Sequence, residues 1–220
     1  EELIEASIIF EGFDINAAPV SAEYIRMMYC DLYKQSYKDE FALNNIQKQV
    51  AARFNAKKGY PRTLFQISDK INFGQYDFGK QGFPITRSDG AGSYKNVGSM
   101  LLYSGTDPRP YCNIPDAMNS FSFPPLIFLD LGQPFTLNFF KIGQDAAMKI
   151  MDSMRRLKID DRALYVRFRV RLLGMSSKNP RPPRAAAAMP NLNFSGEIIG
   201  IDLFYDKSMT MWMTSIPLTN

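Results

Sequence analysis

Residues 164–174 (LYVRFRVRLLG) alternate strictly between apolar and cationic side chains. The apolar members are Val166, Phe168, Val170 and Leu172, and the cationic members are Arg167, Arg169 and Arg171, here called the arginine triplet. Side chains of a strand point to opposite faces of a sheet in turn, so one face is apolar and the other is cationic. A helix would scatter these residues around its circumference. The segment is therefore predicted to be a strand with one face in water, which favours an antiparallel sheet because parallel strands are usually covered on both faces.

The arginine triplet requires acidic neighbours, because three guanidinium groups on one face repel each other. The next predicted strand, residues 194–205, carries Asp202, and Asp206 follows that strand. Antiparallel pairing would set one of these carboxylates near the triplet, at about 0.2–1 kcal/mol for each cross-strand pair. The triplet is therefore predicted to form mainly an ion-pair ladder, and to serve only secondarily as a binding site for an anion or a protein partner.

Apolar periodicity and turn residues place the other elements along the chain. Amphipathic helices are predicted over residues 22–37, 39–57 and 145–158. Further strands are predicted over residues 63–73, 97–103, 126–131, 135–142 and 209–216, with a short edge strand at 7–11. Loops are predicted over residues 74–98, 106–125 and 176–190.

This order of elements predicts an α+β fold. We expect a mostly antiparallel sheet, two N-terminal helices and one further helix packed on the sheet, and long irregular loops. The 220 residues suit a single domain. Its helical N-terminal part would cover residues 22–57, and its sheet-containing part would cover residues 63–216.

Composition excludes several kinds of site. The chain contains no histidine, which excludes histidine triads, histidine general bases and histidine metal sites. Its two cysteines form no Cys-x-x-Cys motif, so a zinc ribbon is excluded as well. We therefore assign no catalytic residue, metal ligand or cofactor. Paired carboxylates can hydrolyse glycosides without histidine, so a hydrolase using Asp or Glu, or a small-ligand-binding protein, stays as the alternative.

Charge is unevenly distributed along the chain. The net charge is +4 overall, −5 over residues 1–50 and +6 over residues 151–200. A basic half could face nucleic acid. However, Phe168 points away from the arginine triplet, and a base-stacking platform needs aromatic and cationic side chains on one face. Nucleic acid is therefore not an expected partner. No apolar run approaches the roughly 20 residues that span a bilayer, so no transmembrane segment is expected.

Residues 176–190 (SSKNPRPPRAAAAMP) are rich in proline and arginine. Such a segment cannot pair in a sheet and is predicted to be a mobile surface loop with polyproline II character. The segment contains Lys178, Arg181 and Arg184 and resembles a proline-rich ligand that binds an aromatic groove of a protein partner. An ordinary exposed loop is the alternative interpretation.

The two cysteines, Cys30 and Cys112, lie far apart in the sequence. They could form one disulfide in an oxidising compartment or remain as two buried thiols. The chain opens on Glu1-Glu2-Leu3 rather than on methionine, which favours removal of a leader or tag. The sequence around the cysteines does not decide between the two states.

Four short motifs resemble an uncharacterised bacterial family built on a domain of unknown function. They are Cys30-Asp31-Leu32-Tyr33, Glu40-Phe41, Tyr76-Asp77-Phe78, and Tyr165 with Arg167-Phe168. The resemblance carries no activity, but it implies exported proteins of the periplasm or outer membrane and thereby favours a Cys30–Cys112 disulfide. Together with the excluded chemistry, it predicts a non-enzymatic exported bacterial protein that acts through protein contacts. Such a protein would be an accessory or structural subunit of a cell-envelope or secretion assembly.

Overall fold

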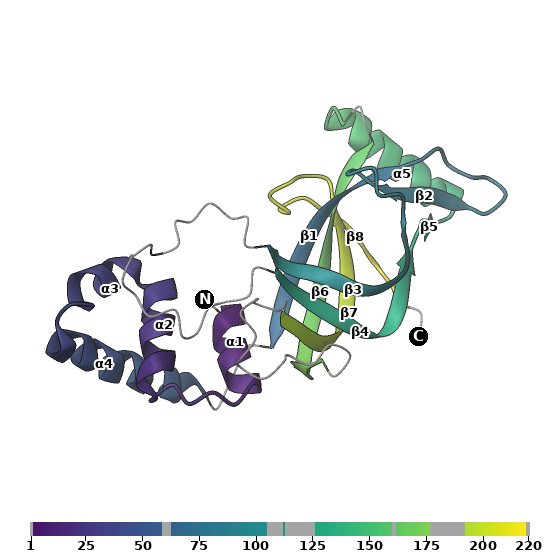
Figure 1. Cartoon of the computed structure of the whole chain (residues 1–220). Helices are drawn as coiled ribbons and strands as arrows, with labels where there is room; N and C mark the ends of the chain where they lie inside the picture. Colours follow the sequence, from purple (N-terminus) through teal and green to yellow (C-terminus); the bar gives the residue numbers. More distant parts are fainter. Residues whose placement is uncertain are drawn as a thin grey trace. The chain divides into compact units, whose positions relative to one another are not determined.

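The structure is a computed structural model of the chain, and it describes residues 2–58, 63–104, 112, 126–159, 162–176 and 192–218. Five helices and eight strands are found in these residues (Figure 1). The helices are α1 (Glu2–Phe10), α2 (Ala18–Met28), α3 (Cys30–Ser36), α4 (Glu40–Lys58) and α5 (Gln144–Arg156). The strands are β1 (Leu64–Phe73), β2 (Gly82–Arg87), β3 (Tyr94–Ser104), β4 (Leu126–Leu137), β5 (Phe139–Lys141), β6 (Ala163–Met175), β7 (Leu192–Phe204) and β8 (Trp212–Ile216).

The chain forms two compact units. The first comprises Glu1–Thr63, Leu101–Phe128 and Gly174–Phe194, and the second comprises Leu64–Met100, Leu129–Leu173 and Ser195–Asn220. Helices α1 to α4 lie in the first unit, and α5 with most of the sheet lies in the second. The single domain expected from the chain length stays a prediction.

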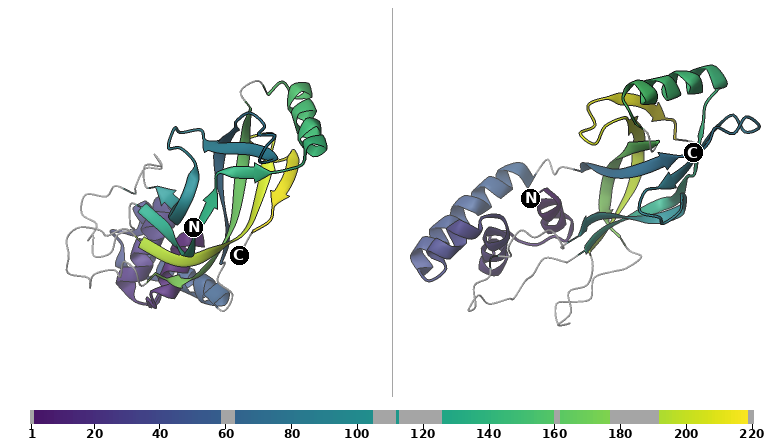
Figure 2. Two further views of the ribbon diagram at one scale, coloured as in Figure 1. Left: turned by 90° about the vertical axis from the view of Figure 1, so that its right-hand side faces the viewer. Right: turned by 90° about the horizontal axis from the view of Figure 1, so that it is seen from above.

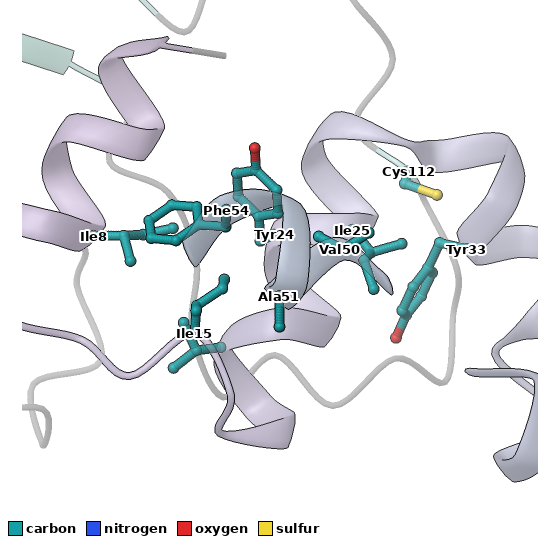
Figure 3. Packing of buried hydrophobic residues seen from close by; sticks show 10 residues of the cluster. Ile8, Ile15, Tyr24, Ile25, Tyr33, Val50, Ala51, Phe54 and Cys112 are labelled. Atoms are coloured by element: carbon teal, nitrogen blue, oxygen red, sulfur yellow. The ribbon is translucent and has the colours of Figure 1, made fainter. Parts of the chain in front are cut away.

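The first unit is built around a helical core. Its buried side chains come from α1 to α4, from the segment before α2 and from Cys112: Ile8, Ile15, Val20, Tyr24, Ile25, Tyr33, Val50, Ala51, Phe54 and Cys112. Figure 3 labels all of them except Val20 and shows them gathered between the helices. Local signals start these helices. Pro19 stands in the first turn of α2, where a missing N–H has no cost. Asp39 caps α4, because its carboxylate accepts the backbone N–H groups of Phe41 and Ala42 at 3.0 Å each.

Two predictions for this unit are wrong. Residues 7–11 lie mostly in α1 instead of forming an edge strand, because Ile8 and its neighbours bury one helical face in the core. The helix predicted over 22–37 is two helices, since Tyr29 leaves helical geometry at φ −136° between α2 and α3. The helix predicted over 39–57 is confirmed as α4.

The second unit is dominated by a curled sheet (Figures 1 and 2). The strand order is β3-β4-β7-β6-β1-β2-β5, with β8 paired to β7. The pairs β1–β2, β1–β6, β2–β5 and β7–β8 are antiparallel. The sheet as a whole is mixed, so the prediction of a mostly antiparallel sheet is wrong. Alternation along residues 164–174 reports which face of the strand is wet, but it does not report the direction of each neighbouring strand.

The central strand is confirmed as β6. Val166, Phe168 and Val170 are fully buried, whereas Arg169 and Arg171 are exposed. β2 and the start of β3 occupy part of the predicted loop 74–98. β4 runs without interruption through residues 132–134, where a turn between two strands was predicted. The predicted helix 145–158 is confirmed as α5, which buries Ala147, Ile150 and Met154.

Two of the predicted loops cannot be compared with the structure in full. Apart from Cys112, residues 106–125 lie outside the described residues, and so do residues 177–190 of the Pro/Arg-rich loop. None of the helices in the described parts of the chain combines the length and apolar character needed to cross a membrane.

Candidate functional site

The arginine triplet lies on the wet face of the sheet in the second unit. Strand β6 pairs with β1 so that Gln66 is opposite Arg169 and Ser68 is opposite Arg167. Directly opposed residues of paired strands point to the same face, so this face continues from β6 onto β1. Both β1 residues are exposed polar groups that do not cover the arginines. The face is therefore open to solvent on the β1 side.

Asp202 of β7 anchors two arginines of the triplet, Arg167 and Arg169, from the other side. Its side chain is 7% exposed, and one carboxylate oxygen lies 3.3 Å from a terminal nitrogen of Arg167 and 3.1 Å from Nε of Arg169. The other oxygen accepts a 2.6 Å hydrogen bond from the hydroxyl of Ser215, which lies opposite Asp202 on β8. The predicted ion pairing by Asp202 is confirmed. A buried carboxylate with three donors holds both guanidinium groups in fixed positions.

The second predicted acid, Asp206, does not join the triplet. Its carboxylate accepts hydrogen bonds from Ser208, Thr210 and the backbone of Met211 within the turn that leads to β8. These hydrogen bonds, the one from Ser208 foremost, lower the pKa of Asp206 from its ordinary value. Asp206 therefore fixes the turn that delivers β8 to β7.

Gly200 makes room for Arg169 to reach Asp202. A Cβ atom built on Gly200 would lie 2.2 Å from a terminal nitrogen of Arg169 and 2.5 Å from its Cζ. The guanidinium of Arg169 therefore lies directly over the backbone of β7. Any larger residue at position 200 would push this guanidinium away from its place.

An aromatic strip completes the face. The guanidinium of Arg167 lies over the ring of Phe204, 4.4 Å from the ring centre, which is the geometry of a cation–π contact. Phe204 is opposite Trp212 in the β7–β8 register, so Trp212 lies on the same face as the triplet. Trp212 is 59% exposed. Sequence reasoning missed Trp212, because it weighed only Phe168 as the aromatic neighbour of the arginines.

Arg171 makes a separate and more exposed pair. A terminal nitrogen of Arg171 lies 3.0 Å from the carboxylate of Glu197, and both side chains are about half exposed. Such an exposed pair contributes about 0–1 kcal/mol to stability. We use the name arginine–tryptophan face for Arg167, Arg169, Arg171, Asp202, Phe204 and Trp212. Lys178, Arg181 and Arg184, the other predicted binding residues, lie outside the described residues.

A second polar cluster joins three strands of the curled sheet. Tyr94 of β3 donates a hydrogen bond to Asp69 of β1, and Arg87 of β2 lies over the Tyr94 ring at 5.2 Å. Arg87 also pairs with Asp69 at 3.7 Å and with Asp89 at 2.6 Å. Burial, together with the hydrogen bond to Asp69, raises the pKa of Tyr94 above its ordinary value. Both carboxylates are engaged by Arg87, so the cluster supports a role in holding the curled sheet together.

Cys30 and Cys112 form a disulfide in the first unit, across 82 residues of sequence. Cys112 is buried in the helical core. The backbone oxygen of Cys112 accepts a 3.3 Å hydrogen bond from Arg26, which is itself paired with the buried Glu23. The disulfide and this hydrogen bond therefore tie Cys112 to α3 and α2.

Neither a depression beside α5 nor a cluster of metal-binding side chains provides a second binding site in the described residues. A shallow depression of about 590 Å³ beside α5 is lined by Lys149, Asp152, Ser153, Arg155 and Arg156. Arg155 is neutralised there by Asp152 at 2.8 Å, and the carbonyl end of the helix opposes anions. In the described part of the chain, no three His, Cys, Asp or Glu side chains gather closely enough to hold a metal ion.

The chain has a family assignment but no further match. No curated protein and no solved structure matches it. Residues 17–156 match the model of the domain of unknown function DUF4852, and this range covers α2 to α4, β1 to β5 and α5. The arginine–tryptophan face lies after the matched residues. Because the match spans more than half of the chain, the resemblance to such a family is confirmed, and the protein belongs to the DUF4852 family.

Proposed function

We propose that the chain is an exported bacterial protein without enzymatic activity, which acts through protein contacts as an accessory subunit of a cell-envelope or secretion assembly. The arginine–tryptophan face is its contact surface. A disulfide between Cys30 and Cys112 supports the export proposal, because disulfides persist in oxidising compartments and are rare in the cytosol.

The observation that carries the contact role is the placement of Trp212. It is the only tryptophan of the chain, and it lies in water beside fixed arginines. Burying an aromatic side chain removes about 150–250 Å² from water, so exposing one is unfavourable without a partner. Tryptophan and arginine are also the residue types most enriched at binding hot spots. Their occurrence together on one sheet face favours a protein interface.

The test is cross-linking of the tagged full-length chain in its native cells, followed by purification and mass spectrometry. The wild type should be recovered with a defined partner, and Trp212→Ala should lose that partner. Phe41→Ala is the matched control, because Phe41 is also an exposed aromatic residue, 78% exposed, but lies on α4. Recovery of the wild type only as a free monomer would overturn the assembly role. Recovery from the cytosol with two reactive thiols would overturn export.

A further inference from the structure

Arg169 presents an unused hydrogen-bonding edge to solvent. Its Nε is paired with Asp202, and within the described part of the chain this is the only ion pair or hydrogen bond of the Arg169 side chain. Its side chain is 45% exposed and lies over Gly200. Within the described residues neither terminal nitrogen of Arg169 has a hydrogen-bond partner, so both can still donate to a ligand. A guanidinium offers two parallel donors to a carboxylate, which is its best-matched partner.

Arg169 is also fixed in place before any ligand binds. Asp202 is buried and is itself held by Ser215 and Arg167, so the anchor of Arg169 does not move easily. Ordering a long side chain during binding costs free energy, and that cost is already met here. This separates Arg169 from ordinary surface arginines, which must lose their freedom when a ligand arrives.

The charge of the face argues against a polyanion. The three arginines of the triplet are paired with two carboxylates, Asp202 and Glu197, so the triplet and its paired acids carry one net positive charge. Nucleic acid binding needs an extended positive surface that neutralises many phosphates. One net charge with one free guanidinium edge instead suits a single carboxylate. The neighbouring Trp212 ring suits an apolar side chain.

The spacing of these two groups defines the ligand further. The guanidinium of Arg169 lies over Gly200, and Trp212 is opposite Phe204, which is four residues along β7 and one strand across. These steps correspond to about 14 Å on a sheet surface. In an extended peptide, side chains four residues apart are about 13 Å apart and point to the same side. The two contact points therefore match residues i and i+4 of an extended segment.

We propose that the arginine–tryptophan face binds an extended acidic segment of a partner protein. Arg169 holds an Asp or Glu carboxylate, and Trp212 packs against an aromatic or large aliphatic side chain four residues away. This proposal rests on the proposed function, whose contact surface it describes in more detail.

The test begins with a displayed library of random dodecapeptides selected on the full-length protein at 0.15 M salt. Enriched peptides should carry Asp or Glu four positions from an aromatic or large aliphatic residue. The best peptide is then labelled and its affinity measured by fluorescence anisotropy. Its Asp→Asn or Glu→Gln analogue should bind at least about tenfold more weakly, because a charge-assisted hydrogen-bond pair is lost.

Variants of the protein test whether Arg169 binds the carboxylate of the peptide. Arg169→Ala and Gly200→Ala should each weaken the peptide at least about tenfold, the latter because its methyl group displaces the guanidinium while the arginine remains. Arg155→Ala removes an equally charged exposed arginine from α5 and should change affinity by less than about twofold. Circular dichroism checks that each variant is folded. Arg169→Lys keeps the positive charge but lacks the two parallel donors of a guanidinium, so it should bind the peptide more weakly than wild type.

Several results would overturn the proposal. These are enriched peptides without an acid, equal binding by Arg169→Ala and wild type, tighter binding of a single-stranded oligonucleotide than of any peptide, and dimerisation of the chain that Trp212→Ala abolishes. Partner loss by Trp212→Ala in cells, with Arg169→Ala unaffected, would leave the proposed function standing and reject only the acidic ligand. Absence of any partner in cells would reject the function itself.

Discussion

Replacing Asp202 by alanine tests whether the buried carboxylate organises the arginine–tryptophan face. The substitution removes the shared acceptor of Arg167, Arg169 and Ser215. Arg167 is then the group most affected, because its side chain is only 26% exposed and it has no second acid in the described part of the chain. The more exposed side chain of Arg169 can rotate out into the solvent.

The magnitude follows from burial. Breaking a fully buried ion pair costs about 3–5 kcal/mol, and an exposed pair is worth about 1 kcal/mol or less. Asp202 is buried while its two arginines are partly exposed, so Asp202→Ala should lower the free energy of unfolding by about 2–3 kcal/mol. Arg169→Ala should cost about 1 kcal/mol or less, since Asp202 keeps Arg167 and Ser215.

The assay is equilibrium unfolding in urea followed by circular dichroism. Glu197→Ala is the matched control, because it removes a carboxylate from the exposed pair with Arg171 and should cost no more than about 0.5 kcal/mol. A double-mutant cycle of Asp202→Ala with Arg167→Ala isolates the coupling between the two groups. Equal losses for Asp202→Ala and Glu197→Ala would refute the anchoring role.

Three further predictions concern other parts of the chain. Titration of the unfolded, unreduced protein should find no free thiol at Cys30 or Cys112, and reduction should lower stability by about 4–5 kcal/mol; two reactive thiols would contradict the bond. Because the pKa of Tyr94 is raised in the folded state, the neutral hydroxyl contributes fully to the free energy of unfolding below pH ~10, and this contribution is lost as the pH rises further. The stability advantage of wild type over Tyr94→Phe should therefore shrink above pH ~10. An advantage independent of pH from 8 to ~11 would contradict this linkage. Gly82→Ala should lower the melting temperature by at least ~5 °C, because its Cβ would lie 2.3 Å from a backbone oxygen, whereas Gly98→Ala meets nothing within 4 Å and should be neutral; equal melting temperatures would show that the sheet yields there.

Alternation predicted β6 and the position of its arginines, because one buried and one wet face leave a clear pattern in the side chains. The same reasoning failed at residues 7–11. A short β-branched run such as Ile8-Ile9 fits either a strand or a buried helix, and the choice depends on the core that α2 and α4 supply. It also missed β2, whose turn-rich surroundings concealed Phe83 and Ile85 in the sheet core.

The candidate site was predictable in part. Asp202 was identified as a partner of the triplet because it falls on the arginine side of the sheet when Ile199, Ile201 and Leu203 join the core. The role of Gly200 could not be predicted from the sequence. Only the observed path of Arg169 across β7 shows that a side chain at position 200 would collide with the guanidinium. Strand direction was also hidden, because neighbours far apart in sequence, such as β4 and β7, are joined through the long chain segments between them.

The position of Trp212 depends on a shift in register that no alternation rule contains. Along β7–β8, Asp202 is opposite Ser215 and Leu203 is opposite Thr214, but Phe204 is opposite Trp212, so one residue is skipped. Regular pairing would place the skipped residue opposite Phe204 and turn Trp212 toward the other face, because a slip of one residue reverses the side of every side chain. The irregularity re-aims a side chain, as β-bulges commonly do. Strict alternation separates Ser215 from Trp212, yet the skipped residue brings both to the face that carries the arginines.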